Sequence, residues 1–142
     1  MNAQAKSWGM NSTVFKGITG ERDETVSTAN NYLTLFKHAD NNMTINQYLH
    51  TDYYQYNEAQ DLDGKPHHYD YNTNALMKET DLPFTILASK TGYLNSAGAN
   101  LAMLIKDNAT GKKFYIITMG NPDYTNQFIT PKQLTEWALK TL

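Results

Sequence analysis

Hydrophobic positions recur at two different periods along this chain, and the period changes near its middle. Four apolar residues repeat at close to helical spacing after Ser27 and Thr28, which are both good N-cap residues: Leu33, Leu35, Phe36 and Ala39. This pattern predicts a helix that ends near residue 39. A weaker repeat predicts a short helix over residues 43–49, and the helix-forming residues 3–8 stop at Gly9, which suits a helix end.

The last third of the chain has the pattern of a sheet. Three β-rich runs cover residues 84–91, 99–106 and 113–119, and glycine-containing turns separate them, so they predict an antiparallel meander. The runs are almost continuously apolar, which indicates strands with little solvent on either face. Another element must therefore cover the predicted sheet.

The C-terminal segment predicts a helix that closes over the meander. Thr130 has the character of an N-cap, and Pro131 suits the first helical position. An apolar stripe is expected to face the sheet: Leu134, Trp137, Ala138 and Leu142.

Tyrosines and polar residues fill the middle of the chain. A run that begins at residue 51 and a second run over residues 67–71 flank the glycine-containing segment 61–65, and together they predict a hairpin. After the hairpin, a brief helical turn is expected to run to Glu79, because Pro83 blocks its continuation.

One further segment, residues 11–24, is rich in Asn, Ser, Thr and Gly and predicts an ordered loop held by Val14, Phe15 and Ile18. No repeat or linker divides the chain. The sequence therefore predicts one domain over residues 1–142 in the α+β class. Its antiparallel sheet consists of the three-strand meander plus the hairpin, with flanking helices.

Composition and charge narrow the class of partner. Twelve basic and 14 acidic side chains give a net charge of −2, so we expect no nucleic-acid partner. The absence of cysteine excludes disulfides and thiolate sites. No run approaches the roughly 20 apolar residues of a membrane helix, and residues 1–6 lack the apolar core of a signal peptide. We therefore expect a globular chain without a signal peptide in these residues.

A short motif closes the first strand of the predicted meander. Lys90 and Thr91 end that strand, Gly92 and Tyr93 follow it, and Asn95-Ser96-Ala97-Gly98 leads into the next strand. Three further segments are similar to motifs that one known protein family carries in the same order: the loop 15–20, Val26-Ser27-Thr28-Ala29 and Asn72-Thr73-Asn74. Over essentially its whole length the chain resembles the D-Ala-D-Ala carboxypeptidases, which are low-molecular-mass penicillin-binding proteins. This resemblance implies the C-terminal part of a β-lactamase/transpeptidase-like domain.

The resemblance also implies a role for each residue of the motif. Lys90 is expected to face the cleft, attract the terminal carboxylate of the substrate and assist proton transfer, while Thr91 hydrogen-bonds that carboxylate. Gly92 has no side chain, so a substrate backbone can approach the strand. The backbone N–H of Tyr93 is expected to be one of two oxyanion-hole donors.

Two other motifs of the family do not occur in these 142 residues. The family places its nucleophile in Ser-x-x-Lys and uses a second motif, Ser-x-Asn. None of the five serines matches either pattern: Ser7, Ser12, Ser27, Ser89 and Ser96. Residues 1–6 resemble the helix that follows Ser-x-Asn. We therefore expect the chain to lack the nucleophile and to be inactive alone.

Three hypotheses fit these observations. The chain is part of a serine-type carboxypeptidase or endopeptidase that acts on peptidoglycan stem peptides and binds β-lactams, or a non-catalytic binding or assembly module with the same fold, or one part of a split enzyme. Its expected protein partner is the missing N-terminal half or a second copy of itself. The resemblance implies an extracytoplasmic location, in the periplasm or at the cell surface.

One departure from the family concerns recognition of the substrate's carboxylate. Many relatives carry an arginine just after a strand that ends in Met-Gly, whereas here Met119-Gly120 is followed by Asn121-Pro122. The only arginine of the chain is Arg22. The sequence therefore predicts no bidentate contact to a carboxylate in this region.

Other polar and aromatic residues have structural interpretations. Ser27 and Thr28 are expected to cap a helix rather than to act as nucleophiles. Five tyrosines are expected to form cross-strand pairs of the hairpin, and no glycan site is inferred from them: Tyr53, Tyr54, Tyr56, Tyr69 and Tyr71.

No metal site or cofactor is expected. His67 and His68 are adjacent, so on a strand they point to opposite faces and cannot chelate one ion together. Asp61 and Asp63 resemble the start of a calcium loop, but its twelfth position is Asn72 instead of an acidic ligand. A hairpin turn explains these aspartates better.

Overall fold

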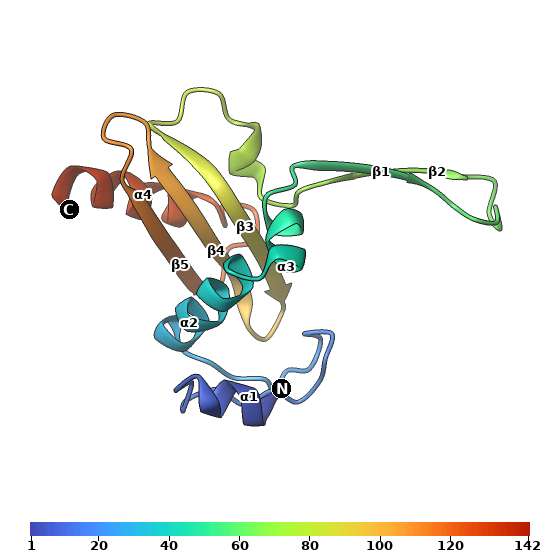
Figure 1. Ribbon diagram of the computed structural model, residues 1–142, viewed down its shortest axis with the longest axis horizontal. Helices are drawn as coiled ribbons and strands as arrows, with labels where there is room; N and C mark the ends of the chain where they lie inside the picture. The colour runs from blue at the N-terminus through green and yellow to red at the C-terminus, as the bar shows by residue number, and fades with distance from the viewer.

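The computed structural model describes all of residues 1–142 and has the α+β architecture that the sequence predicts (Figure 1). Its elements are, in chain order, α1 (Asn2–Ser7), α2 (Ala29–Asp40), α3 (Met43–Leu49), β1 (Tyr53–Asn57), β2 (His67–Tyr71), the 3-10 helix η1 (Ala75–Lys78), β3 (Phe84–Leu94), β4 (Gly98–Asp107), β5 (Lys113–Asn121) and α4 (Ile129–Thr141). None of the helices has the length and apolar character that a membrane span requires.

The meander forms a three-stranded antiparallel sheet in the order β3-β4-β5. In its register, Lys90 pairs with Ala102 and Gly92 pairs with Asn100. Because β4 is the central strand, β3 and β5 each keep one edge without a neighbouring strand. The segment that carries Lys90-Thr91-Gly92 therefore lies on a free edge of the sheet.

Both faces of the sheet are covered, as the apolar runs predict. Alternate residues of β4 point to opposite sides, so Leu101, Met103 and Ile105 pack on the α4 side. Ala102 and Leu104 pack with residues of α2 and α3 on the other side. Figure 1 shows this arrangement, with α4 behind the sheet and α2 and α3 in front of it. The sheet is thus the middle layer between two hydrophobic clusters.

The caps of α2 and α3 explain where these helices begin. Thr28 accepts a hydrogen bond from the backbone N–H of Asn31, which confirms one of the two predicted caps. Asn42 caps α3 by accepting from the N–H groups of Thr44 and Ile45. Gly9 has a φ of 75° just after α1, a conformation that glycine adopts easily.

The predicted start of the last helix was wrong. Helix α4 begins at Ile129 after the N-cap Phe128, and no side chain caps it, so Thr130 and Pro131 lie inside its first turn. Proline is tolerated there because the first N–H groups of a helix have no intrahelical partner. The predicted apolar stripe was also wrong in part: Ala138 is buried, but Trp137 is 54% and Leu142 67% exposed.

The first strand of the meander is longer than predicted. β3 continues through Gly92 and Tyr93 to Leu94, so only residues 95–97 connect it to β4. The turn is short because Gly98 has a φ of 66° and packs directly against the backbone of Asn121. Gly92 and Tyr93 are therefore strand residues with regular pairing partners, instead of turn residues.

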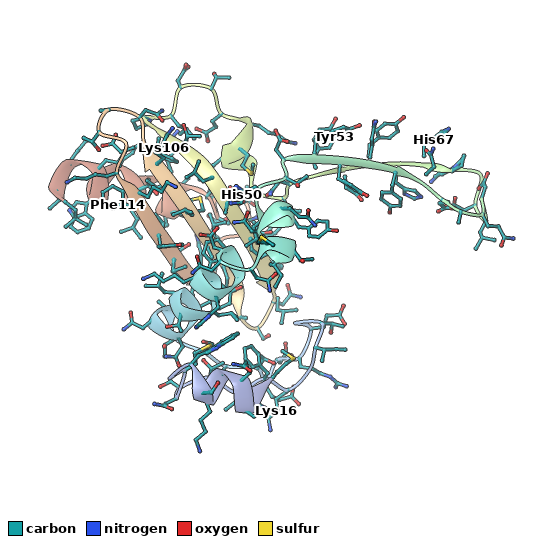
Figure 2. All side chains as sticks on the ribbon, in the orientation of Figure 1. Lys16, His50, Tyr53, His67, Lys106 and Phe114 are labelled. Atoms are coloured by element: carbon teal, nitrogen blue, oxygen red, sulfur yellow. The ribbon has the colours of Figure 1, made fainter.

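The predicted hairpin is a separate two-stranded sheet, which we call the arm (β1 and β2 with the connecting residues 58–66). Tyr53 pairs with Tyr71 and Tyr56 with His68, as expected for cross-strand pairs. Figures 1 and 2 show the arm extending away from the body, with side chains such as Tyr53 and His67 on its surface. It packs on no core of its own.

Candidate functional site

A cavity of about 540 Å³ lies beside the free edge of β3. All four residues of the predicted motif line it: Lys90, Thr91, Gly92 and Tyr93. The opposite wall comes from the loop between α1 and α2 and from the first turns of α2, which includes Tyr32. We call this cavity the cleft.

The loop that forms the opposite wall is fixed by hydrogen bonds at both of its ends. Val14 and Val26 form an isolated antiparallel bridge, and Asn2 of α1 exchanges side-chain hydrogen bonds with the backbone of Phe15 at 2.8 and 2.9 Å. At the cleft mouth, the hydroxyl of Ser96 donates to Asp23 at 2.5 Å. The loop is therefore tied to the turn between β3 and β4.

One predicted anchor of this loop is not an anchor. Ile18 is 89% exposed, although it lines the cleft. The hydrogen bonds described above hold the loop in its place, so the loop does not depend on burial of Ile18. An exposed isoleucine at the wall of a cavity offers apolar surface to a ligand.

Three of the four motif residues already make side-chain hydrogen bonds within the chain. The ammonium group of Lys90 donates to the backbone carbonyl of Thr91 at 2.6 Å. The hydroxyl of Thr91 shares a hydrogen bond with the hydroxyl of Thr73, which follows the arm. The hydroxyl of Tyr93 donates to Asn95 at 2.9 Å. The side chains are thus held along the strand edge.

Gly92 is different, because nothing in the chain requires a glycine there. A Cβ atom built on Gly92 meets no other atom within 4 Å, and its φ is not positive. The missing side chain leaves open space at the edge of the strand. This geometry suits the approach of an extended ligand backbone, as in strand addition.

The sequence reasoning missed one residue of the cleft. Arg22 lines the same cavity as Lys90 and Met119, although no sequence pattern placed it beside the segment that follows Met119. The loop folds back beside the edge of β3 and brings Arg22 to the cleft. A local sequence pattern cannot predict a contact between positions so far apart in the chain. The side chains that line the cleft therefore include two cations, Arg22 and Lys90, and one carboxylate, Asp23.

Tyr32 lies on the α2 side of the cleft. Burial raises the pKa of its phenol above the usual 10.0, so it stays neutral at physiological pH. It is therefore a hydrogen-bonding group with no charge of its own.

The structural interpretation of Ser27 and Thr28 is confirmed. The hydroxyl of Ser27 lies 2.8 Å from the hydroxyl of Thr13, and Thr28 caps α2. Asn31, which follows them, accepts from the backbone N–H of Ser12 and from Thr13. These contacts join α2 to the loop, so the serine and threonine have structural partners.

The arm holds three carboxylates whose oxygen atoms lie within 4.8 Å of one another, those of Glu58, Asp61 and Asp63. Asp61 accepts from the backbone N–H groups of Asp63 and Gly64, as in a turn, and Glu58 lies 2.8 Å from His68. The aspartates therefore serve the turn, as predicted. His67 instead contacts Asn57, at 2.6 Å.

An α+β domain with a Lys-Thr-Gly strand at the free edge of its sheet and a cleft beside it defines a class: the penicillin-binding protein fold. Solved structures agree. The chain is similar to a D-alanyl-D-alanine carboxypeptidase from Mycobacterium tuberculosis H37Rv, with a TM-score of 0.73 and 21% sequence identity over 99% of this chain and 52% of that one. It is also similar to an evolved penicillin-binding protein homolog from Mycobacterium tuberculosis, with a TM-score of 0.74, 21% identity and the same coverage.

A sequence profile of the family described as D-alanyl-D-alanine carboxypeptidase, peptidase S11, matches residues 1–123. The chain belongs to this family. It spans about half the length of the solved structures that it matches. No curated protein sequence shows significant similarity to it.

Proposed function

We propose that this chain carries one wall of the substrate cleft of a serine-type D-Ala-D-Ala carboxypeptidase or endopeptidase that trims peptidoglycan stem peptides. The supporting observation is that Lys90, Thr91, Gly92 and Tyr93 line one cavity at a free strand edge. In this proposal the strand edge pairs with the peptide backbone, and Lys90 and Thr91 attract its terminal carboxylate. The proposed substrate lies outside the cytoplasmic membrane, so the proposed location is extracytoplasmic.

The proposed reaction is acyl transfer. A serine hydroxyl attacks the carbonyl carbon of the D-Ala-D-Ala bond and D-alanine leaves, and water then releases the shortened peptide from the serine. The N–H of Tyr93 is proposed to stabilise the oxyanion together with a second donor. None of the five serines lies in Ser-x-x-Lys, so we propose that residues 1–142 bind a ligand but do not form the acyl-enzyme alone.

Covalent labelling tests this proposal. Residues 1–142 and a longer product of the same gene are incubated with a fluorescent penicillin, and each is analysed by gel fluorescence and intact mass. We expect no adduct on the 142-residue chain and one adduct on the longer product. An adduct on the 142-residue chain, located by peptide mapping, would show that it contains a nucleophile.

The alternative function is a non-catalytic binding or assembly module. Its motivation is the free edges of β3 and β5, which can pair with another chain. Such a module is proposed to recruit either a chain that carries the N-terminal part of the family's fold or a second copy of itself. Light scattering across a range of concentrations measures the second possibility, and a stable monomer with cooperative unfolding would argue against self-association.

A further inference from the structure

The charge of the cleft selects the class of ligand group that it can hold. Its lining side chains contribute two cations, Lys90 and Arg22, while the single carboxylate, Asp23, accepts a hydrogen bond from Ser96. Lys90 already donates to the backbone carbonyl of Thr91. Arg22 takes part in none of the ion pairs of the structure. Neither cation has an anionic partner, but the ammonium of Lys90 is already hydrogen-bonded to the strand, whereas no ion pair engages the guanidinium of Arg22.

Contacts within the loop fix the position of the Arg22 side chain near its backbone. A Cβ atom on Gly17 would lie 2.9 Å from the Cγ atom of Arg22, so the stem of the arginine crosses the space that a side chain at position 17 would fill. The backbone carbonyl of Arg22 accepts from the N–H of Thr25 at 3.0 Å, and the next residue, Asp23, is tied to Ser96. These contacts hold the start of the arginine side chain at the cleft.

A guanidinium presents parallel N–H donors in a planar fork that matches the two oxygen atoms of a carboxylate. From these observations we infer that Arg22 binds the terminal carboxylate of a peptide in the cleft, across from Lys90. Arg22 is then a residue that determines specificity for a free C-terminus. This inference rests on the proposed function of the cleft as a peptide-binding site.

The test compares two ligands that differ only in charge. An N-acylated peptide ending in D-Ala-D-Ala is titrated into the 15N-labelled chain as the free acid and as the C-terminal amide, and the dissociation constants are obtained from amide chemical shifts. We expect the acid to bind roughly tenfold more tightly than the amide, because a charge-assisted bidentate contact is lost in the amide. In Arg22→Gln this preference should fall several-fold, to what Lys90 and Thr91 provide, while binding of the amide stays within about twofold.

Three further variants distinguish a bidentate contact of the Arg22 guanidinium from a general effect of positive charge. Lys16→Gln removes a cation from the same loop at a residue outside the cleft lining, so it should keep the preference for the acid (Figure 2). Gly17→Ala keeps the arginine but displaces its stem, and it should reduce the preference. Arg22→Lys should restore only part of it, because an ammonium is a single point charge.

Two results would overturn the inference, and they are distinguishable. If the chain binds both peptides at Lys90 to Tyr93 but Arg22→Gln keeps the tenfold preference, the cleft binds peptides and Arg22 is not its carboxylate ligand. If neither peptide shifts these amides, the proposed function of the cleft fails, and the role of Arg22 fails with it.

Discussion

The body sheet and the arm are both made of antiparallel strands joined by turns, but they differ in what holds them together. In the body, β4 is buried on both faces, and Met103 and Ile105 are inaccessible to solvent. In the arm, nearly every strand residue is exposed, and tyrosines pack mainly on one another, for example Tyr53 against Tyr71 with ring centroids 4.9 Å apart. Stability therefore comes from the body, and residues of the arm can change with little cost to the fold.

The largest difference should appear when a side chain is truncated in each region. Ile105→Ala removes buried methylene groups from the cluster between the sheet and α4, and should lower the free energy of unfolding by about 2 to 5 kcal/mol. Tyr69→Ala removes a ring that is 60% exposed, and should cost about 1 kcal/mol or less. Urea unfolding of both variants measures the difference. Equal losses would mean that the arm belongs to the cooperative core.

Two glycines of the body sharpen the comparison within one sheet. Gly98→Ala should lower the free energy of unfolding by at least about 2 kcal/mol, because φ is 66° and the new Cβ would lie 2.6 Å from the carbonyl oxygen of Asn121. Gly92→Ala, by contrast, places its Cβ within 4 Å of no other atom and needs no positive φ, so it should raise the free energy of unfolding by about 0.5 to 1 kcal/mol.

Gly92, which lines the cleft, also tests it. Gly92→Ala should weaken peptide binding measurably even though the fold is kept, since the added methyl group occupies the free strand edge. Calorimetry or urea unfolding gives the stability, and a peptide titration gives the binding. A Gly92→Ala variant that unfolds easily would mean that this glycine serves the fold instead of a ligand.

The smallest effect is expected from acid, at the turn that joins β4 to β5. The hydroxyl of Thr110, and then the backbone N–H of Ala109, hold the pKa of Asp107 below the ordinary value of 3.8. A lowered pKa in the folded state stabilises the protein above pH 3.8, and the contribution is lost as the pH falls through the lowered pKa. Thermal unfolding is measured from pH 7 to pH 2. The melting temperature of Asp107→Asn should lie below that of the unchanged chain at neutral pH, and the two melting temperatures should converge in acid. A constant difference at every pH would contradict the assignment.

The sequence was enough for the elements that follow a local pattern. The meander, the arm and the cap at Thr28 come from apolar periods and turn residues, which act over a few positions. The start of α4 was missed because its N-cap, Phe128, makes no side-chain capping hydrogen bond, so no sequence signal marks the start at Ile129. The length of β3 was missed because a glycine was taken as the end of the strand.

The site was predictable only on one side. Lys90 to Tyr93 are contiguous, so a motif could identify them, and they do line the cleft. The opposite wall depends on contacts between residues far apart in the chain, such as Ser96 with Asp23. Arg22 was therefore assigned no place near the cleft, although the loop brings it there. Tertiary contacts of this kind produce no periodic pattern of residues from which they could be predicted.

One measurement tests most directly whether the strand edge of the body, and not the arm, is the ligand-binding region. The 15N-labelled chain is titrated with an N-acylated peptide ending in D-Ala-D-Ala, and its intact mass is recorded at the end point. We expect amide shifts at Gly92 and Tyr93, unchanged resonances over the arm, and no change of mass. Shifts confined to the arm, or none at the strand edge, would contradict this assignment of the cleft.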